Sequence, residues 1–270
     1  MKSLFFLLAV ALFLSPQANA QNFTTSDDKK WCEESNEYRN GNREKHCEVW
    51  ETTLAADRDV IRVDGGKNGG IKVEGWDRNE ILVKVKVKSW ARSKEDAIEL
   101  VRGVEIETGR VIESDVPNTK RKESISVTYH IFVPHNSDLD LETFNGGIMI
   151  SEVSGDIRFD ALNGGVKLIG LGGDVRGKTT NGGLRVELEG SEWEGEKLDV
   201  RTMNGGVLFL VPEDYNAQLE TATVNGSLDL DFPVTVSGRI SRNISVTIGN
   251  GGNTVKATTT NGGVKIKHTS

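Results

Sequence analysis

One tripeptide, Asn-Gly-Gly, recurs through the second half of the chain and constrains the fold more than any other feature. It starts at six asparagines, five followed by Gly-Gly and one by Gly-Ser, at intervals of 18, 18, 23, 21 and 36 residues. Because 36 is twice 18, we expect a degenerate seventh copy at the midpoint, Asn243. The predicted turn residues are Asn145, Gly146, Gly147, Asn163, Gly164, Gly165, Asn181, Gly182, Gly183, Asn204, Gly205, Gly206, Asn225, Gly226, Asn261, Gly262 and Gly263.

The residues around each asparagine keep the same register. The third and fifth residues after it are apolar in all seven copies, and a small residue, usually Thr, stands two positions before it. Alternating apolar and polar residues indicate strands with one buried face, and a period of 18 to 23 residues is typical of a solenoid. We therefore predict an all-β fold, a parallel β-solenoid (β-helix) of about seven coils, each of about 18–23 residues.

Asparagine and glycine tolerate a left-handed backbone, so we expect that conformation where Asn-Gly-Gly turns the chain. A second corner is predicted at Ser154-Gly155-Asp156, at Gly172-Gly173-Asp174 and at Gly251-Gly252-Asn253. The alternative is an antiparallel sandwich in which Asn-Gly marks hairpins. The fixed period, with both strands kept in each copy, favours the solenoid.

Four segments are predicted along the 270 residues. Residues 1–20 have the pattern of a secretory signal, with an apolar core too short to span a membrane and an Ala18-Asn19-Ala20 cleavage site. Residues 21–59 form a polar, irregular leader, and residues 60–138 a small β-rich region with one helix near 93–102, capped by Ser93. Residues 139–270 form the Asn-Gly-Gly solenoid.

The two cysteines, Cys32 and Cys47, both lie in the leader. An even number of cysteines in an exported chain favours a disulfide, which would close a loop of about 15 residues and contribute about 3 kcal/mol. Two free thiols are the alternative, and a metal site that includes His46 is disfavoured because too few ligands lie nearby.

The repeats, the lead-in at residues 71–77 and the segment from Val133 to Thr143 resemble the bacterial "putative adhesin" domain of unknown function. The resemblance covers residues 60 to 268 and implies a β-solenoid. It supplies no catalytic residues and no cofactor. The leader and the helix near 93–102 lie outside it.

Several side chains are candidates for a site. Asp156 and Asp174 share a phase and could hold Ca²⁺, but solvated acids countered by neighbouring arginines are the favoured interpretation. Together with Asp160 they are also the acids that a carbohydrate-active enzyme would need. The tryptophans 76, 90 and 193 could stack on sugar rings or partners, or pack at the ends of the solenoid. Lys265, Lys267 and His268 would place charge on the last strand and discourage growth at that end.

The expected function is that of an exported, non-catalytic module at the cell envelope that binds a protein or glycan, in the periplasm, on the cell surface or secreted. A formal net charge of −7 argues against nucleic acid as a partner. No membrane span is expected after removal of the signal, and no cofactor or metal is expected. A carbohydrate-active β-helix enzyme and an envelope-stress signalling partner are the alternatives.

Overall fold

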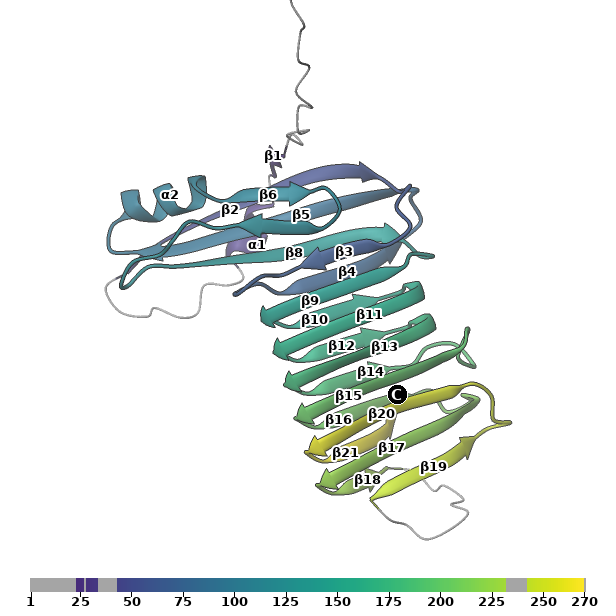
Figure 1. Ribbon diagram of the computed structural model, residues 1–270. Helices are drawn as coiled ribbons and strands as arrows, with labels where there is room; N and C mark the ends of the chain where they lie inside the picture. The colour runs from purple at the N-terminus through teal and green to yellow at the C-terminus, as the bar shows by residue number, and fades with distance from the viewer. Residues whose placement is uncertain (1–22, 27, 34–42, 232–241, 270) are drawn as a thin grey trace, which may run out of the picture.

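The computed structural model describes residues 23–26, 28–33, 43–231 and 242–269. Two long sheets face each other and are joined at both edges by short corners, so that most of the molecule is a stack of flattened coils (Figure 1). The predicted parallel β-solenoid is therefore confirmed. The predicted signal at residues 1–20 lies outside the described residues.

The first sheet, sheet A, has eleven strands, and the second, sheet B, has ten. In spatial order, sheet A consists of β1 (Thr24–Thr25), β2 (Glu44–Ala55), β5 (Glu80–Ala91), β8 (Ser124–Pro134), β4 (Ile71–Trp76), β10 (Ile148–Ser151), β12 (Val166–Ile169), β14 (Leu184–Glu187), β16 (Val207–Val211), β21 (Val264–His268) and β18 (Leu228–Leu230). Sheet B consists of β19 (Asn243–Ile248), β17 (Ala217–Asn225), β20 (Thr254–Asn261), β15 (Lys197–Asn204), β13 (Gly172–Asn181), β11 (Ser154–Asn163), β9 (Leu139–Asn145), β3 (Ile61–Asp64), β7 (Ile112–Asp115) and β6 (Glu105–Thr108).

Seven coils can be followed through the described residues, each with one strand in each sheet. Neighbouring coils pair in parallel and in register, as Ile157 does with Val175 and Val175 with Leu198. These apolar residues point inward and form one continuous core with the inward residues of sheet A. The alternation of apolar and polar residues thus places one face of each strand in the core and the other in solvent.

The solenoid starts earlier than predicted, at Ile61 rather than at residue 139. Strands β3 and β4 form its first coil, because Ile61 pairs with Leu139 and Ile71 with Ile148. The corner of this coil is Asn68-Gly69-Gly70, a further copy of the repeat beyond those predicted. Its corner carries an extra residue, with Gly66 in the left-handed region at φ 62°, which shifts the preceding strand out of the register of the other copies.

The last part of the chain does not continue the stack in order. Strands β20 and β21 lie between the coil of β15 and β16 and the coil of β17 and β18 (Figure 1). Strand β19 pairs antiparallel to β17 at the outer edge, so the prediction that Asn243 begins a degenerate coil is wrong. Lys265, Lys267 and His268 therefore lie on an interior strand, and the described end strands are β18 and β19.

The seven corner asparagines form a ladder of side-chain hydrogen bonds. After Asn68, each Nδ2 donates to the Oδ1 of the asparagine in the preceding coil, at 2.8–2.9 Å in five steps and 3.3 Å in the step from Asn145 to Asn68. Their spatial order is Asn68, Asn145, Asn163, Asn181, Asn204, Asn261 and Asn225. In such a ladder, every interior asparagine donates a hydrogen bond through its Nδ2 group and accepts one at its Oδ1 atom.

The reason for glycine at this corner differs from the prediction. The corner glycines after Asn145, Asn163, Asn181, Asn204, Asn225 and Asn261 do not have positive φ. A Cβ on Gly182 would instead collide with the backbone carbonyl of Gly164, and each first glycine of these triplets meets the neighbouring coil in the same way. Left-handed glycines occur at the second corner, where Gly173 has φ 90° and Gly252 has φ 141°.

The threonine that usually stands two positions before each corner asparagine makes a hydrogen bond to the neighbouring coil. The hydroxyls of Thr143, Thr179, Thr202, Thr259 and Thr223 donate at 2.6–2.7 Å to the carbonyl of the first corner glycine in the preceding coil. These threonines are buried, so each bond satisfies a carbonyl that water does not reach. Ala161 stands at the equivalent position of β11 and has no hydroxyl to donate.

Replacing Thr202 by valine is therefore expected to lower the free energy of unfolding by about 1–2 kcal/mol, because the Gly182 carbonyl loses its donor while the side-chain volume is kept. Urea denaturation measures the change. Thr180→Val, on an outward-facing position of β13, is the control and should change stability little. Equal effects of the two substitutions would contradict the role given to the buried hydroxyl.

The N-terminal end of the solenoid is covered by longer antiparallel strands and a helix. Strands β2, β5 and β8 extend sheet A, while β7 and β6 extend sheet B. The predicted helix is present as α2 (Lys94–Arg102), and the Ser93 hydroxyl accepts from the Asp96 amide at 3.1 Å. Its buried residues Ala97, Leu100 and Val101 join the core and close this end.

The leader is more ordered than predicted. Residues 44–55 form the twelve-residue strand β2, paired along its whole length with β5. Only Val49 and Leu54 are buried in β2, so it lacks the alternating apolar pattern that marks a strand in sequence. Cys47 on this strand is bonded to Cys32 in the short helix α1 (Lys29–Glu33), which confirms the predicted disulfide.

Lys88 on β5 is buried, with 7% of its surface exposed. Burial lowers its pKa to about 8, and Lys45 and Lys86 act in the same direction. Its ammonium lies 5.1 Å from the centre of the Trp90 ring. Because the unfolded chain holds this proton up to its ordinary pKa, the folded state should gain stability as the pH rises from about 8 to about 10.5.

Lys88→Met is expected to raise the free energy of unfolding at pH 7 by about 1–3 kcal/mol and to flatten this rise with pH. Urea denaturation at pH 7 and at about pH 9.5 measures both effects. Lys167→Met, at a half-exposed position of β12, serves as the control. A Lys88→Met variant less stable than the parent at pH 7 would show that the ammonium is fully compensated where it lies.

Candidate functional site

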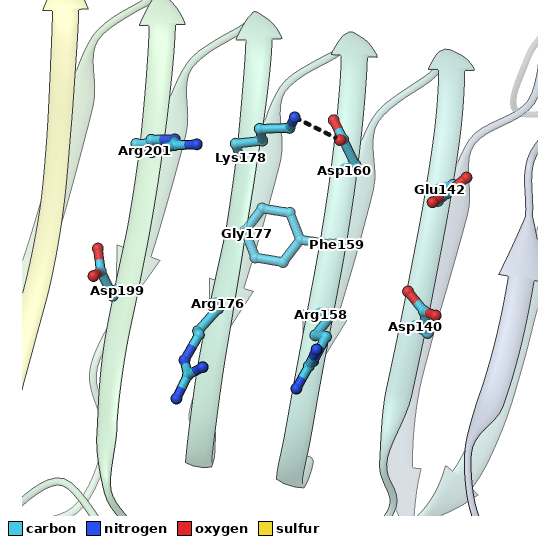
Figure 2. Close-up of a pocket in the computed structure, with 10 residues that line it drawn as sticks. All are labelled: Asp140, Glu142, Arg158, Phe159, Asp160, Arg176, Gly177, Lys178, Asp199 and Arg201. Carbon is cyan, nitrogen blue, oxygen red and sulfur yellow. Dashed lines mark ion pairs between the residues drawn. The ribbon is translucent and has the colours of Figure 1, made fainter.

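A shallow groove crosses the outer face of sheet B. Strands β9, β11, β13 and β15 each contribute two outward charged residues, which form two rows across the sheet (Figure 2). The groove has a volume of about 400 Å³ and is open to solvent. The first row is Glu142, Asp160, Lys178 and Arg201, and the second is Asp140, Arg158, Arg176 and Asp199.

Ion pairs hold part of this array in place. Lys178 Nζ lies 3.0 Å from an Asp160 carboxylate oxygen on the next strand. Arg158 reaches Asp156 on its own strand at 3.1 Å, and Arg176 is paired in the same way with Asp174. The hydrogen bond to Asp156 raises the pKa of the Arg158 guanidinium above its ordinary value. The groove therefore presents fixed charges of both signs.

A large and a small residue form the floor of the groove. Phe159 on β11 and Gly177 on β13 pair directly, and the Phe159 ring occupies the space that a side chain on Gly177 would need (Figure 2). Phe159 is 4% exposed, so its ring acts mainly as core. The flat floor follows from this fit, since no side chain rises between the two charged rows.

The groove continues toward the Asn-Gly-Gly corner. A second hollow shares Glu142 and Asp160 with it and adds Phe144 and Leu162. Phe144 is 50% exposed, and farther along the same outward row Met203 is 52% and Val224 56% exposed. Apolar side chains thus alternate with threonines in a row beside the charged rows, because Thr180 lies between Leu162 and Met203 and Thr260 between Met203 and Val224.

The candidate acids of the sequence lie on this face. Asp156 and Asp174 are direct neighbours in the register of β11 and β13, as their phase predicted, and each is engaged by an arginine two residues further on. Asp160 lies one row away, paired with Lys178. Among the described residues, no three or more His, Cys, Asp or Glu side chains are grouped so that they could hold a metal ion.

The three tryptophans singled out from the sequence have different surroundings. Trp193 is buried and donates to the Gly173 carbonyl at 3.1 Å, so it packs at a corner within the stack and not at an end. Trp76 packs on Phe132, with ring centres 5.3 Å apart, beneath the guanidinium of Arg78. Trp90, on β5, lies beside Lys88 in the N-terminal cap.

Beside Trp76, the outer face of sheet A carries a half-buried hydrogen-bonded pair, in which His130 Nε2 lies 2.9 Å from a Glu74 carboxylate oxygen. Burial lowers the pKa of His130 and outweighs the opposing effect of the Glu74 carboxylate. The pKa of Glu74 is lowered as well, by its bonds to Lys72 and His130 acting against burial. The pair lies between Trp31 and Phe132, and its contacts are those of a packed surface cluster.

None of the helices among the described residues is both long and apolar enough to cross a membrane.

These features define a parallel β-solenoid with a capped N-terminal end and a flat, charged outer face on sheet B. The sequence pattern of the Toastrack DUF4097 family matches residues 123–267, which is more than half of the chain. The chain therefore belongs to the Toastrack DUF4097 family. The matched segment extends from β8 to β21 and includes every strand that lines the groove.

Three of the solved structures that the chain matches are described as follows. A "putative cell adhesion protein" from Clostridium sporogenes is 11% identical, covers 84% of this chain and 100% of its own, and has a TM-score of 0.42. A "putative lipid binding protein" from Parabacteroides distasonis is 12% identical, covers 86% of this chain and 98% of its own, and has a TM-score of 0.32. A "putative adhesin" from Bacteroides fragilis is 12% identical, covers 83% of this chain and 97% of its own, and also has a TM-score of 0.32. No curated protein matches the chain significantly in sequence.

Proposed function

We propose that this protein is an exported, non-catalytic binding module of the cell envelope, and that the outer face of sheet B is its binding face. One observation supports this choice above the others. Four parallel strands hold eight charged side chains in register around an open groove, beside the exposed apolar side chains of Phe144 and Met203. Rigid rows of this kind suit recognition of an extended surface, since the binding groups are already positioned.

The acids on this face are arranged for recognition more than for catalysis. Glycoside hydrolysis needs one carboxyl group whose pKa is raised and a second one facing it across the substrate. Asp156 and Asp160 are instead each engaged by a cation, Arg158 at 3.1 Å and Lys178 at 3.0 Å, so neither carboxylate is left facing an open space across the groove. Export through residues 1–20 agrees with the disulfide between Cys32 and Cys47, because disulfides persist in oxidising compartments.

Two measurements test the proposal. Export predicts that the full chain, expressed in a bacterial host, is recovered outside the cytoplasm with an N-terminus at Gln21. Binding predicts that immobilised protein retains a component of an envelope extract, and that Arg176→Glu with Arg201→Glu abolishes the retention. Lys167→Glu with Arg185→Glu, on the outer face of sheet A, is the matched control and should leave retention intact.

Turnover of a polysaccharide would contradict the non-catalytic part of the proposal. A panel of envelope and plant polysaccharides incubated with the purified protein should yield no new reducing ends. If cleavage occurs and is lost in Asp156→Asn or Asp174→Asn, the carbohydrate-active alternative is correct.

A further inference from the structure

The charges on the outer face of sheet B are arranged antisymmetrically about its strand β13. On one side, β11 presents an acid, a base, an acid and an apolar residue, namely Asp156, Arg158, Asp160 and Leu162. On the other side, at the same heights along the strand, β15 presents the opposite charges and again an apolar residue, namely Lys197, Asp199, Arg201 and Met203.

The pattern continues one and two strands farther out. Asp140 on β9 has its counterpart in Lys256 on β20, and Arg62 on β3 has its counterpart in Glu220 on β17. In the row of Asp160 the outer counterparts are neutral, because Glu142 corresponds to Thr258 and Asp64 to Ala222. Along the row that contains Arg158, every charge on one side of β13 thus has an opposite charge at the same distance on the other side.

From this antisymmetry we infer that the partner of this face is a second copy of the chain. The two copies would lie face to face, related by a two-fold axis that runs parallel to the strands and passes over β13. Such an axis reverses the order of the strands and keeps their direction, so each residue of β11 faces its counterpart on β15 of the second copy. The inference rests on the proposed function, whose binding face it assigns.

This arrangement brings opposite charges together in all three rows beside the axis, and at every step in the row of Arg158. Asp156 faces Lys197, Arg158 faces Asp199 and Asp160 faces Arg201 of the second copy, and each contact occurs twice, as in any isologous interface. Packed sheets lie about 10 Å apart, a separation that long charged side chains from both faces can span. Complementary charges of this kind fix the register of an interface.

The residues on the axis meet their own copies and would repel if they were free. They are neutralised within each chain, because Arg176 is paired with Asp174 and Lys178 with Asp160. Beside the axis the apolar side chains also meet, since Leu162 on β11 faces Met203 on β15 of the second copy, whereas Phe144 farther out faces Thr260. Burying Met203, now 52% exposed, and its neighbours would supply the apolar contribution.

The size of the face suits a dimer. Strands spaced about 4.8 Å apart and rising about 3.3 Å per residue give the seven coils a face of about 34 by 23 Å. That footprint corresponds to about 800 Å² on each partner, the typical contribution to a stable interface. No described segment lies across this face in Figure 1.

The test exchanges charges between the two sides. The full chain should sediment as a dimer at micromolar concentration and low salt, and added salt should weaken the dimer. Asp160→Lys and Arg201→Glu should each sediment as monomers, because each variant places like charges opposite one another. An equimolar mixture of the two variants should recover the dimer, since the introduced lysine of one variant then faces the introduced glutamate of the other. Lys167→Glu, on sheet A, is the control and should remain a dimer.

A parent chain that is monomeric throughout, variants that still dimerise, or a mixture that stays monomeric would each overturn the inference. Circular dichroism melting of every variant checks that it is folded. The outcome is separable from that of the proposed function. If the parent is monomeric but Arg176→Glu with Arg201→Glu still abolishes retention of an envelope component, the binding face is correct and its partner is not a second copy.

Discussion

Replacing Gly182 by alanine is expected to lower the free energy of unfolding by about 3 kcal/mol or more, a large effect for a single added methyl group. The new Cβ would collide with the backbone carbonyl of Gly164 in the neighbouring coil. Neither group can rotate away, because both belong to a corner held by the asparagine ladder. Relief of the overlap requires the coils to separate, which weakens the register of both sheets.

The neighbouring glycine provides the matched control. A Cβ on Gly183 would lie 3.4 Å from the Gly206 carbonyl, which is an ordinary contact. Ser227 already occupies the equivalent place in the coil that begins at Asn225. Gly183→Ala should therefore change stability by less than about 1 kcal/mol. Urea denaturation compares the two variants, and equal losses would show that backbone conformation, not close approach, explains the glycines.

Removing residues 250–270 is expected to unfold the C-terminal part of the solenoid and leave the rest intact. These residues form β20 and β21. In the last coil, β17 pairs with β20 and β18 pairs with β21. Without them β17 and β18 face a gap one coil wide, and their inward residues, such as Leu219, lose their packing. Nearest-neighbour stacking confines the damage, because each coil depends mainly on the coils beside it.

Hydrogen exchange measured by mass spectrometry follows this prediction by segment. Amides of β17 and β19 should exchange rapidly in the truncated chain, whereas those of β11 to β14 should keep most of their protection. If β17 keeps its protection, it has moved next to β15 and restored a continuous stack in sequence order. Removal of residues 23–33, at the opposite end, controls for the effect of truncation itself.

Much of the fold could be predicted because the corner repeats carry their own physical requirements. Asn181 must bond to the asparagine of the coil on each side, Gly182 must lack a Cβ and Thr202 must reach a buried carbonyl, so the same residue types recur in the same register. The period reveals a coil wherever these three conditions are met. The coil of Asn68 was missed because the extra residue near Gly66 displaces its preceding strand.

The order of the coils in space could not be predicted from the repeat. Every corner offers the same hydrogen bonds, so the corner of Asn261 can stack on that of Asn204 as well as on that of Asn225, and in the structure it stacks on both. The position of β19 determines the order of the coils. It runs antiparallel along the outer edge of β17, so the chain returns to place β20 between β15 and β17. Nothing in the periodic positions records that path.

The groove was only partly visible in the sequence. The shared phase of Asp156 and Asp174 predicts that they are neighbours, but it does not indicate Lys178 and Arg201. These two stand three residues before their asparagines, in a column of the repeat alignment whose charge changes from copy to copy. Comparing such columns by charge would have revealed the rows, although the place of Lys256 beside them depends on the spatial order of the coils.

The order of the strands on this face determines which charges are neighbours, and one measurement tests it directly. Arg201 and Thr258 are paired on adjacent strands, whereas Ala222 lies beyond Thr258 on the next strand. A chain carrying Arg201→Cys and Thr258→Cys should form an internal disulfide under mild oxidation, mapped by mass spectrometry apart from the bond between Cys32 and Cys47. Arg201→Cys with Ala222→Cys should not. Formation of the second bond and absence of the first would show that the coils stack in sequence order and would contradict the face described here.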